Sequence, residues 1–161
     1  MDELEKGLEI SLTGEPRARV LRRAARQLAS WGVALPPVGP LVLDFGLGRF
    51  QEIGLVEYWI ANEAEAGYCG KYLFVFDGQT CPTHRHGAKT ETFFVVHGNV
   101  RMTLDGRAQD MAPGEVLRVP HGRSHSFTGI GPALLLELST PCEIDDNEFS
   151  NPAIPIGRSA E

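Results

Sequence analysis

Histidine and glutamate side chains in the middle of the chain have the types and spacing of metal ligands. His84 and His86 are two residues apart, and Glu91 follows after a short turn. Residues two apart on a β-strand project from the same face, so both imidazoles would point the same way. His125 lies on a later segment. Three imidazoles and one carboxylate that converge inside a fold suit one divalent transition ion, such as manganese, iron, nickel or zinc.

A small β-structure is needed to bring these four side chains together. From Pro36 onward, glycine and proline separate short segments rich in Val, Leu, Phe, Tyr and Thr, which is typical of strands. Asp105-Gly106 and Asp77-Gly78 predict tight turns. The expected strands are residues 53–60, 71–76, 79–84, 91–96, 100–104, 115–119, 124–128 and 133–139. About eight short strands predict a mainly β fold, either an antiparallel barrel or a double-sheet jelly roll.

One helix is expected before the strands. Apolar residues recur with helical periodicity at Leu21, Ala24, Ala25, Leu28 and Trp31. A proline in the first turn and a glycine after the last one suit the two ends. Arginines fill other positions, so we interpret an amphipathic helix with basic side chains in solvent; a basic helix that binds membrane or nucleic acid is the alternative. We therefore divide the chain into a helical segment (1–35), a barrel (36–140) and a tail packed on or over it (141–161).

Composition limits the partners and the compartment. The chain has 161 residues and a net charge of −6, which disfavours a nucleic-acid surface. Its apolar runs are far shorter than a membrane span, and its acidic first residues lack the apolar core of a signal peptide. Its three cysteines show no CxxC spacing, which argues against a disulfide framework. We expect a cytoplasmic domain that binds neither membrane nor nucleic acid, with a small molecule as its partner.

The four ligands stand in two segments with fixed spacing. The first runs from Gly78 through five residues to the His-x-His pair, four more to Glu91 and six more to a second glycine. The second runs from Gly114 through five residues to Pro-x-Gly and two more to His125. This pairing resembles the two-part signature of the cupin superfamily, and it implies a cupin-type barrel with a metal ion inside. Gly129 stands where the family pattern usually has Asn, at a turn rather than at a ligand.

A narrower resemblance covers residues 43–154. It rests on LDFGLG at 43–48, YCGK at 68–71, GQTCPTHRH at 78–86, KTETF at 89–93, ELST at 137–140 and DDNEF at 145–149. These segments are similar to the D-lyxose isomerases, which are cupin-type ketol-isomerases of aldopentoses and aldohexoses. The resemblance implies a metal-dependent aldose–ketose isomerase acting through an enediol on a small free sugar, D-lyxose with D-xylulose or D-mannose with D-fructose. We take manganese as the first candidate metal, with iron, nickel, cobalt or zinc as alternatives, and a homodimer as the expected assembly.

Two residues near the ligands are candidates for proton transfer. Lys89 lies between two ligands, where its cation would stabilise an enediolate, or would relay a proton if burial and the metal lowered its pKa. A solvated turn lysine is the alternative. Glu137 interrupts an apolar run, which predicts either an inward-facing base or an ion pair with Arg101 or Arg118.

The tail and the pocket walls leave further alternatives. Asp146 and Glu148 are candidate catalytic acids of a lid over the mouth, or else solvent-exposed loop acids. Phe93 and Phe127 share strand faces with the ligands, so each would line the pocket or belong to the barrel core. Cys81 has the opposite strand parity to the His-x-His pair and is expected to point away from the metal.

Two functions of other classes use the same ligands. A cupin dioxygenase would bind iron and consume oxygen. A sugar- or metabolite-binding cupin would bind its ligand without turnover. Ketose formation from a free aldose distinguishes the isomerase from both.

Overall fold

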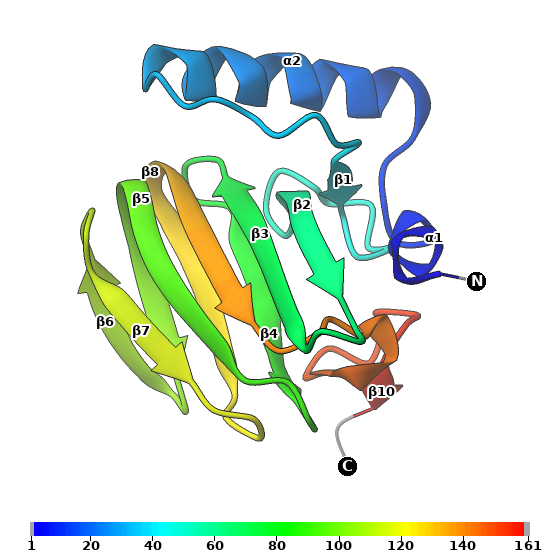
Figure 1. Cartoon of the computed structure of the whole chain (residues 1–161). Helices are drawn as coiled ribbons and strands as arrows, with labels where there is room; N and C mark the ends of the chain where they lie inside the picture. Colours follow the sequence, from blue (N-terminus) through cyan, green and yellow to red (C-terminus); the bar gives the residue numbers. More distant parts are fainter. Residues whose placement is uncertain (1, 160–161) are drawn as a thin grey trace.

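Antiparallel β-strands are the main secondary structure of the chain, and a long helix lies across one face of them (Figure 1). The structure is a computed structural model that describes residues 2–159. Its helices are α1 (Glu3–Leu8), α2 (Gly14–Ser30) and the 3-10 turn η1 (Ile144–Asp146). Its strands are β1 (Leu41–Leu43), β2 (Leu55–Glu63), β3 (Tyr68–Val75), β4 (Thr80–His86), β5 (Glu91–Leu104), β6 (Arg107–Met111), β7 (Val116–Val119), β8 (His125–Ser139), β9 (Asn147–Phe149) and β10 (Arg158–Ser159). The predicted mainly β fold with an N-terminal helix is confirmed.

Two long strands, β5 and β8, join two layers into one curled sheet. The first half of β5 pairs with β7 and with the second half of β8, whereas its second half pairs with β6 and with the first half of β8. β3, β2 and β1 extend the first layer, and β4 and β9 extend the second. The result is a half-barrel in two layers, as Figure 1 shows, and it matches the predicted double-sheet arrangement.

Each long strand lies where the sequence predicts two short ones. The pairing of β5 with β8 shifts register at residues 95–99, around Gly98, which has a φ of 75°. A Cβ atom at Gly98 would lie 2.1 Å from the carbonyl oxygen of Pro132 in β8, so only glycine allows the strands to approach this closely. The strands therefore bend at glycine and continue into the other layer. A glycine in a strand pattern marks a break but does not distinguish a bend from an end.

Helix α2 covers part of the outer face of the first layer. It buries Val20, Ala24 and Leu28 against sheet residues such as Phe74, and Gly32 follows its end with a φ of 70°. Four arginines on its other faces are exposed: Arg19, Arg22, Arg23 and Arg26. The predicted amphipathic helix is therefore confirmed. In the part of the chain that the structure describes, no helix has the length and apolar content needed to cross a bilayer.

The C-terminal tail is an added edge of the second layer. β9 pairs antiparallel with β4, and β10 pairs parallel with β9. Sequence patterns do not predict β1, β9 or β10, because these strands have only two or three residues, and they do not predict β6 either. In β6, four of the five residues are exposed, so the alternation that marks a strand with one buried face is missing.

Candidate active site

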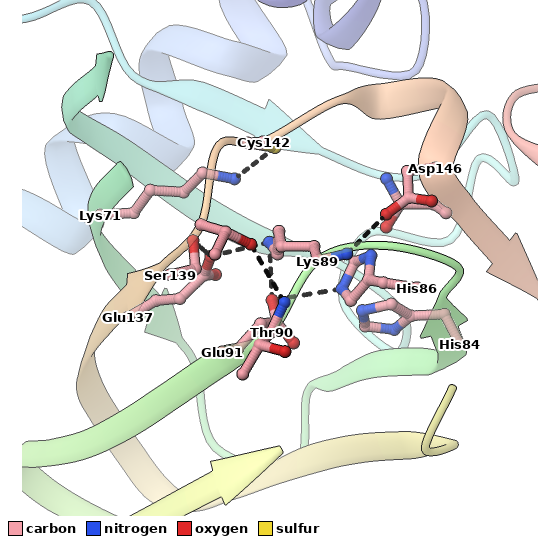
Figure 2. A network of polar contacts seen from close by, with 12 residues as sticks. Lys71, His84, His86, Lys89, Thr90, Glu91, Glu137, Ser139, Cys142 and Asp146 are labelled. Carbon is pink, nitrogen blue, oxygen red and sulfur yellow. Dashed lines mark hydrogen bonds and ion pairs between the residues drawn. The ribbon is translucent and has the colours of Figure 1, made fainter. Parts of the chain in front are cut away.

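Four buried side chains meet between the two layers. His84 and His86 project from the same face of β4, Glu91 is the first residue of β5, and His125 is the first residue of β8. One nitrogen or oxygen atom from each lies within 4.8 Å of those of the others. Figure 2 shows His84 and His86 of β4 beside Glu91 of β5. The structure thus brings together all four of the ligands predicted from strand parity and spacing.

Backbone carbonyls orient two of the imidazoles. His84 Nδ1 lies 2.8 Å from the carbonyl oxygen of Pro82, and His125 Nδ1 lies 3.1 Å from that of Arg123. A carbonyl oxygen only accepts hydrogen bonds, so each Nδ1 must carry a proton, and Nε2 is the ring nitrogen left to face a metal. This is the usual arrangement around histidine ligands of metals.

Several buried atoms of the cluster have no hydrogen-bond partner in residues 2–159. They are His86 Nδ1, His86 Nε2, His125 Nε2 and Glu91 Oε2. Glu91 Oε2 lies 2.9 Å from His125 Nε2, yet the two atoms are not aligned for a hydrogen bond. Buried polar atoms are nearly always satisfied, so a group of orphaned nitrogen and oxygen atoms this close together could hold a metal ion. Imidazole nitrogens and a carboxylate are also the donors that divalent transition ions prefer, so the four residues fit such an ion.

The protonation states of His84 and Glu91 suit metal binding as well. Burial, and then the nearby His125 and His86, hold the pKa of His84 well below its usual value, so that imidazole is neutral. Burial alone raises the pKa of Glu91, but the Lys89 ammonium and the two histidines that face this carboxyl outweigh burial and hold the pKa well below its usual value. A neutral imidazole and an ionised carboxylate are the forms that coordinate metals.

Lys89 joins this cluster to a second carboxylate. Its Nζ lies 2.6 Å from Glu91 Oε1 and donates a hydrogen bond of 2.8 Å to Glu137 Oε1 (Figure 2). Only 5% of Lys89 is exposed, so the alternative of a solvated turn lysine is wrong. Burial lowers the pKa of Lys89, but the Glu137 and Glu91 carboxylates outweigh burial and hold that pKa well above its usual value. The expectation of a lowered pKa is therefore not met in this arrangement, and Lys89 is a buried cation.

Glu137 faces the pocket from β8. It is 3% exposed, and it accepts hydrogen bonds from Lys89 and from Ser139 Oγ, at 3.1 Å. The alternative ion pairs with arginine are not formed. Arg101 pairs with Asp110 on the exposed surface, and Arg118 is exposed. The charge within the apolar run is therefore compensated by a lysine 48 residues away in sequence.

Asp146 and Glu148 do not join the pocket. The Asp146 carboxylate accepts hydrogen bonds from the backbone N–H groups of Ala88 and Lys89, at 3.0–3.1 Å, and Glu148 accepts one from Arg85 Nε at 2.6 Å. Both acids are half-buried rather than solvent-exposed. They hold the tail against β4 and against the turn that carries Lys89. Their neighbours Asn147 and Phe149 line the pocket instead.

A narrow pocket surrounds these groups, with about 50 Å³ of room for the centres of water-sized spheres. Phe93 and Phe127 line it and also belong to the core, so both alternatives for them hold. Cys81 lines it too, contrary to the prediction from strand parity, because a bulge between Cys81 and His84 shifts the pairing of β4 with β8.

Sequence reasoning missed Glu57 and Lys71, two further charged residues of the lining. Each is a charge within an apolar strand, which is the same pattern that identified Glu137.

Known proteins share both the sequence pattern and the fold. Residues 24–105 match the D-lyxose isomerase family, and residues 73–139 match the cupin domain. A D-lyxose/D-mannose isomerase from Thermosediminibacter oceani is 29% identical over 141 residues, which cover 70% of this chain and 77% of that protein. The D-lyxose ketol-isomerase of Cohnella laeviribosi is 29% identical over 164 residues, covering 82% of this chain and 88% of that protein.

The same fold is found among solved structures. An L-ribose isomerase from Cellulomonas parahominis superposes with a TM-score of 0.76 and 16% identity, over 90% of this chain and 95% of that one. An L-ribose isomerase variant from Acinetobacter, in complex with L-ribose, gives a TM-score of 0.73 and 16% identity over 91% of this chain and 95% of that one. The predicted cupin fold is therefore confirmed.

Proposed function

The chain belongs to the D-lyxose isomerase family, and we propose from this that it interconverts D-lyxose with D-xylulose or D-mannose with D-fructose. It is a sugar isomerase. Such an enzyme moves one proton between C1 and C2 of the open-chain sugar and redistributes the hydrogens of O1 and O2. The observation that carries the proposal is the buried row Glu91–Lys89–Glu137, which places a cation and a second carboxylate beside the four candidate ligands.

We assign the metal to His84, His86, Glu91 and His125, with manganese as the first candidate and iron, nickel, cobalt or zinc as alternatives. When bound there, a divalent ion would act as a Lewis acid toward the two sugar oxygens and stabilise the negative charge of an enediolate. The buried atoms of this cluster that have no hydrogen-bond partner support the assignment of these residues as metal ligands.

The proton transfers are assigned to the Lys89–Glu137 pair. The Glu137 carboxylate takes the proton from C2 and returns it to C1, which turns the aldose into the ketose. Lys89 Nζ gives a proton to O1 and regains one from O2, so the pair ends the cycle unchanged. The apolar walls formed by Phe93, Phe127 and Phe149 exclude water from the site and strengthen these electrostatic interactions.

The charges of the lining favour a free sugar over a sugar phosphate. Three carboxylates (Glu57, Glu91 and Glu137) and two lysines (Lys71 and Lys89) line the pocket, and among its lining residues there is no arginine. Phosphate sites typically use arginines or backbone N–H groups at a helix N-terminus. A neutral polyol with many hydroxyl groups suits alternating ammonium and carboxylate groups better.

A panel of free aldoses tests the proposed reaction. Purified protein loaded with manganese, iron, nickel, cobalt or zinc should form ketose from D-lyxose or D-mannose, detected by NMR, and should not act on their phosphate esters. A chelator should abolish ketose formation, and manganese should restore it. If no aldose gives ketose with any of these metals, the isomerase reaction is refuted for this chain. Oxygen uptake would then favour the dioxygenase, and ligand-induced stabilisation without turnover would favour a binding protein.

We further propose that the chain acts in the cytoplasm as a homodimer. Its three cysteines are buried free thiols, as expected in a reducing compartment. The outer face of the first layer carries exposed apolar side chains beyond the edge of α2: Tyr68, Phe94, Val116 and Leu138. Phe94 pairs with Val116 in β7 and with Leu136 in β8, so the patch is continuous across strands and a second copy would cover it.

Light scattering after size-exclusion chromatography tests the dimer. The wild type should show twice the mass of one chain, and Leu138→Lys should shift it to the mass of one chain without loss of helix or strand signal. The lysine is expected to act at the interface alone, because Leu138 is 54% exposed in the single chain. A monomeric wild type would contradict the proposed dimer.

A further inference from the structure

A second charged pair lines the pocket beyond Lys89 and Glu137. Lys71 from β3 and Glu57 from β2 both line it, and their nearest charged atoms are 3.4 Å apart. The strand register places Lys71 directly opposite Glu137 of β8. In Figure 2, Lys71 lies on the opposite side of Lys89 from His84. The charged groups therefore alternate in sign across the pocket, from the carboxylate of the candidate metal site to Glu57.

The Lys71 ammonium lacks a close oxygen partner among the residues that the structure describes. Lys71 is 3% exposed, and besides Glu57 at 3.4 Å it contacts only the Cys142 thiol at 3.2 Å and the face of the Trp59 ring at 4.3 Å. An ammonium has three N–H donors, a separation of 3.4 Å is long for N–H···O, and a thiol is a weak acceptor. The hydrogen bonds of this buried cation are therefore weak ones, which a ligand oxygen could replace at little cost.

Glu57 is held in place by the same ring. The indole N–H of Trp59 donates a hydrogen bond of 2.7 Å to Glu57 Oε2, while the face of the ring supports the Lys71 ammonium. Trp59 thus fixes an acceptor and a donor side by side. A hydroxyl group both donates and accepts, so it can satisfy Glu57 and Lys71 together, whereas a phosphate would meet the Glu57 carboxylate with like charge.

We infer that Lys71 and Glu57 form a subsite for the hydroxyl groups at the end of an open-chain sugar remote from its carbonyl. This inference rests on the proposed function, because it takes the sugar carbonyl to lie at the four-residue cluster. β2 and β5 are separated by β3 and β8, so at about 4.8 Å per strand their backbones lie about 14 Å apart, and Glu57 and Glu91 belong to opposite ends of the same pocket lining. The subsite then selects sugars by length and by the configuration of their distal carbons.

Alditols separate this subsite from catalysis, because they have hydroxyl groups but no carbonyl to isomerise. Calorimetry with the metal-loaded protein should show that a five-carbon alditol binds more tightly than a four-carbon one. Lys71→Met and Glu57→Gln should each remove that difference, a loss of roughly tenfold or more in affinity for the longer alditol with little change for the shorter. Lys6→Met, which changes a lysine outside the pocket, is the matched control and should leave both affinities unchanged.

Two outcomes would overturn the subsite. One is that the wild type binds neither alditol or binds both equally; the other is that the variants weaken both alditols to the same extent. If Lys71→Met does not fold, the isosteric Glu57→Gln decides the matter alone. Failure of the proposed reaction has a different signature, because the alditol preference would persist in a protein that forms no ketose. Conversely, ketose formation with unchanged length preference in both variants would refute the subsite alone.

Discussion

Replacing Glu137 by glutamine is expected to slow ketose formation by roughly 10²–10⁴-fold, the usual cost of losing a positioned base. Glutamine keeps the shape of the side chain and an oxygen that can accept from Lys89 and Ser139, so the fold and the metal content should persist. Lys89→Met should cost a similar factor, although it leaves Glu137 buried without its cation and is also expected to lower stability. Initial rates and elemental analysis on the same preparations measure both effects.

The tail acids provide the comparison for this prediction. Asp146→Asn and Glu148→Gln should slow turnover much less than Glu137→Gln, because neither side chain lines the pocket. Asp146 acts only through the turn that it holds at Ala88 and Lys89. Full turnover by Glu137→Gln with full metal would exclude Glu137 as the base. If, in addition, Asp146→Asn or Glu148→Gln lost turnover by the larger factor, the base would belong to the tail.

Removing one ligand is expected to remove most of the metal. Wild-type protein should contain close to one divalent ion per chain, whereas His84→Ala and His125→Ala should contain little and should form no ketose. The metal should also raise the melting temperature of the wild type, because an ion that binds only the folded state stabilises it, by about 4 kcal/mol at a thousandfold excess over Kd. Neither variant should respond in this way.

His121→Ala is the matched control for the ligand variants. His121 lies four residues before His125 on the same segment, but its side chain is exposed and outside the cluster. It should keep the ion, the melting response and the turnover of the wild type. Full metal occupancy in both His84→Ala and His125→Ala would refute the assigned ligand set.

The four candidate ligands could be predicted from the sequence because their arrangement depends on local rules. Strand parity places His84 beside His86, and the spacing of the two segments resembles a known signature. The same parity rule fails three residues earlier at Cys81, where a bulge in β4 turns the side chain into the pocket. A bulge depends on how neighbouring strands pair, and a single sequence does not show that pairing.

The remainder of the pocket depends on contacts between distant strands. Glu137 is recognisable as a charge in an apolar run, but its partner Lys89 is 48 residues away. Spacing alone does not show whether Glu137 pairs with this lysine or with an arginine. Lys71 faces Glu137 only because β3 and β8 pair in this register. In the tail, the sequence suggests the acids Asp146 and Glu148 as pocket residues. The pairing of the short strand β9 with β4 instead places Asn147 in the pocket lining.

Hydrogen transfer in heavy water tests most directly whether this pocket moves a proton. Wild-type protein should be incubated in D₂O with the aldose that it converts fastest. The incubation should continue for many turnovers after the sugars reach equilibrium, and the sugars should then be analysed by NMR. Even if most protons return internally, repeated turnovers should accumulate deuterium at C1 of the ketose and C2 of the aldose, and Glu137→Gln should abolish that accumulation. Ketose that forms at full rate while C1 keeps only protium after many turnovers would contradict the account, because the hydrogen would then pass directly from carbon to carbon.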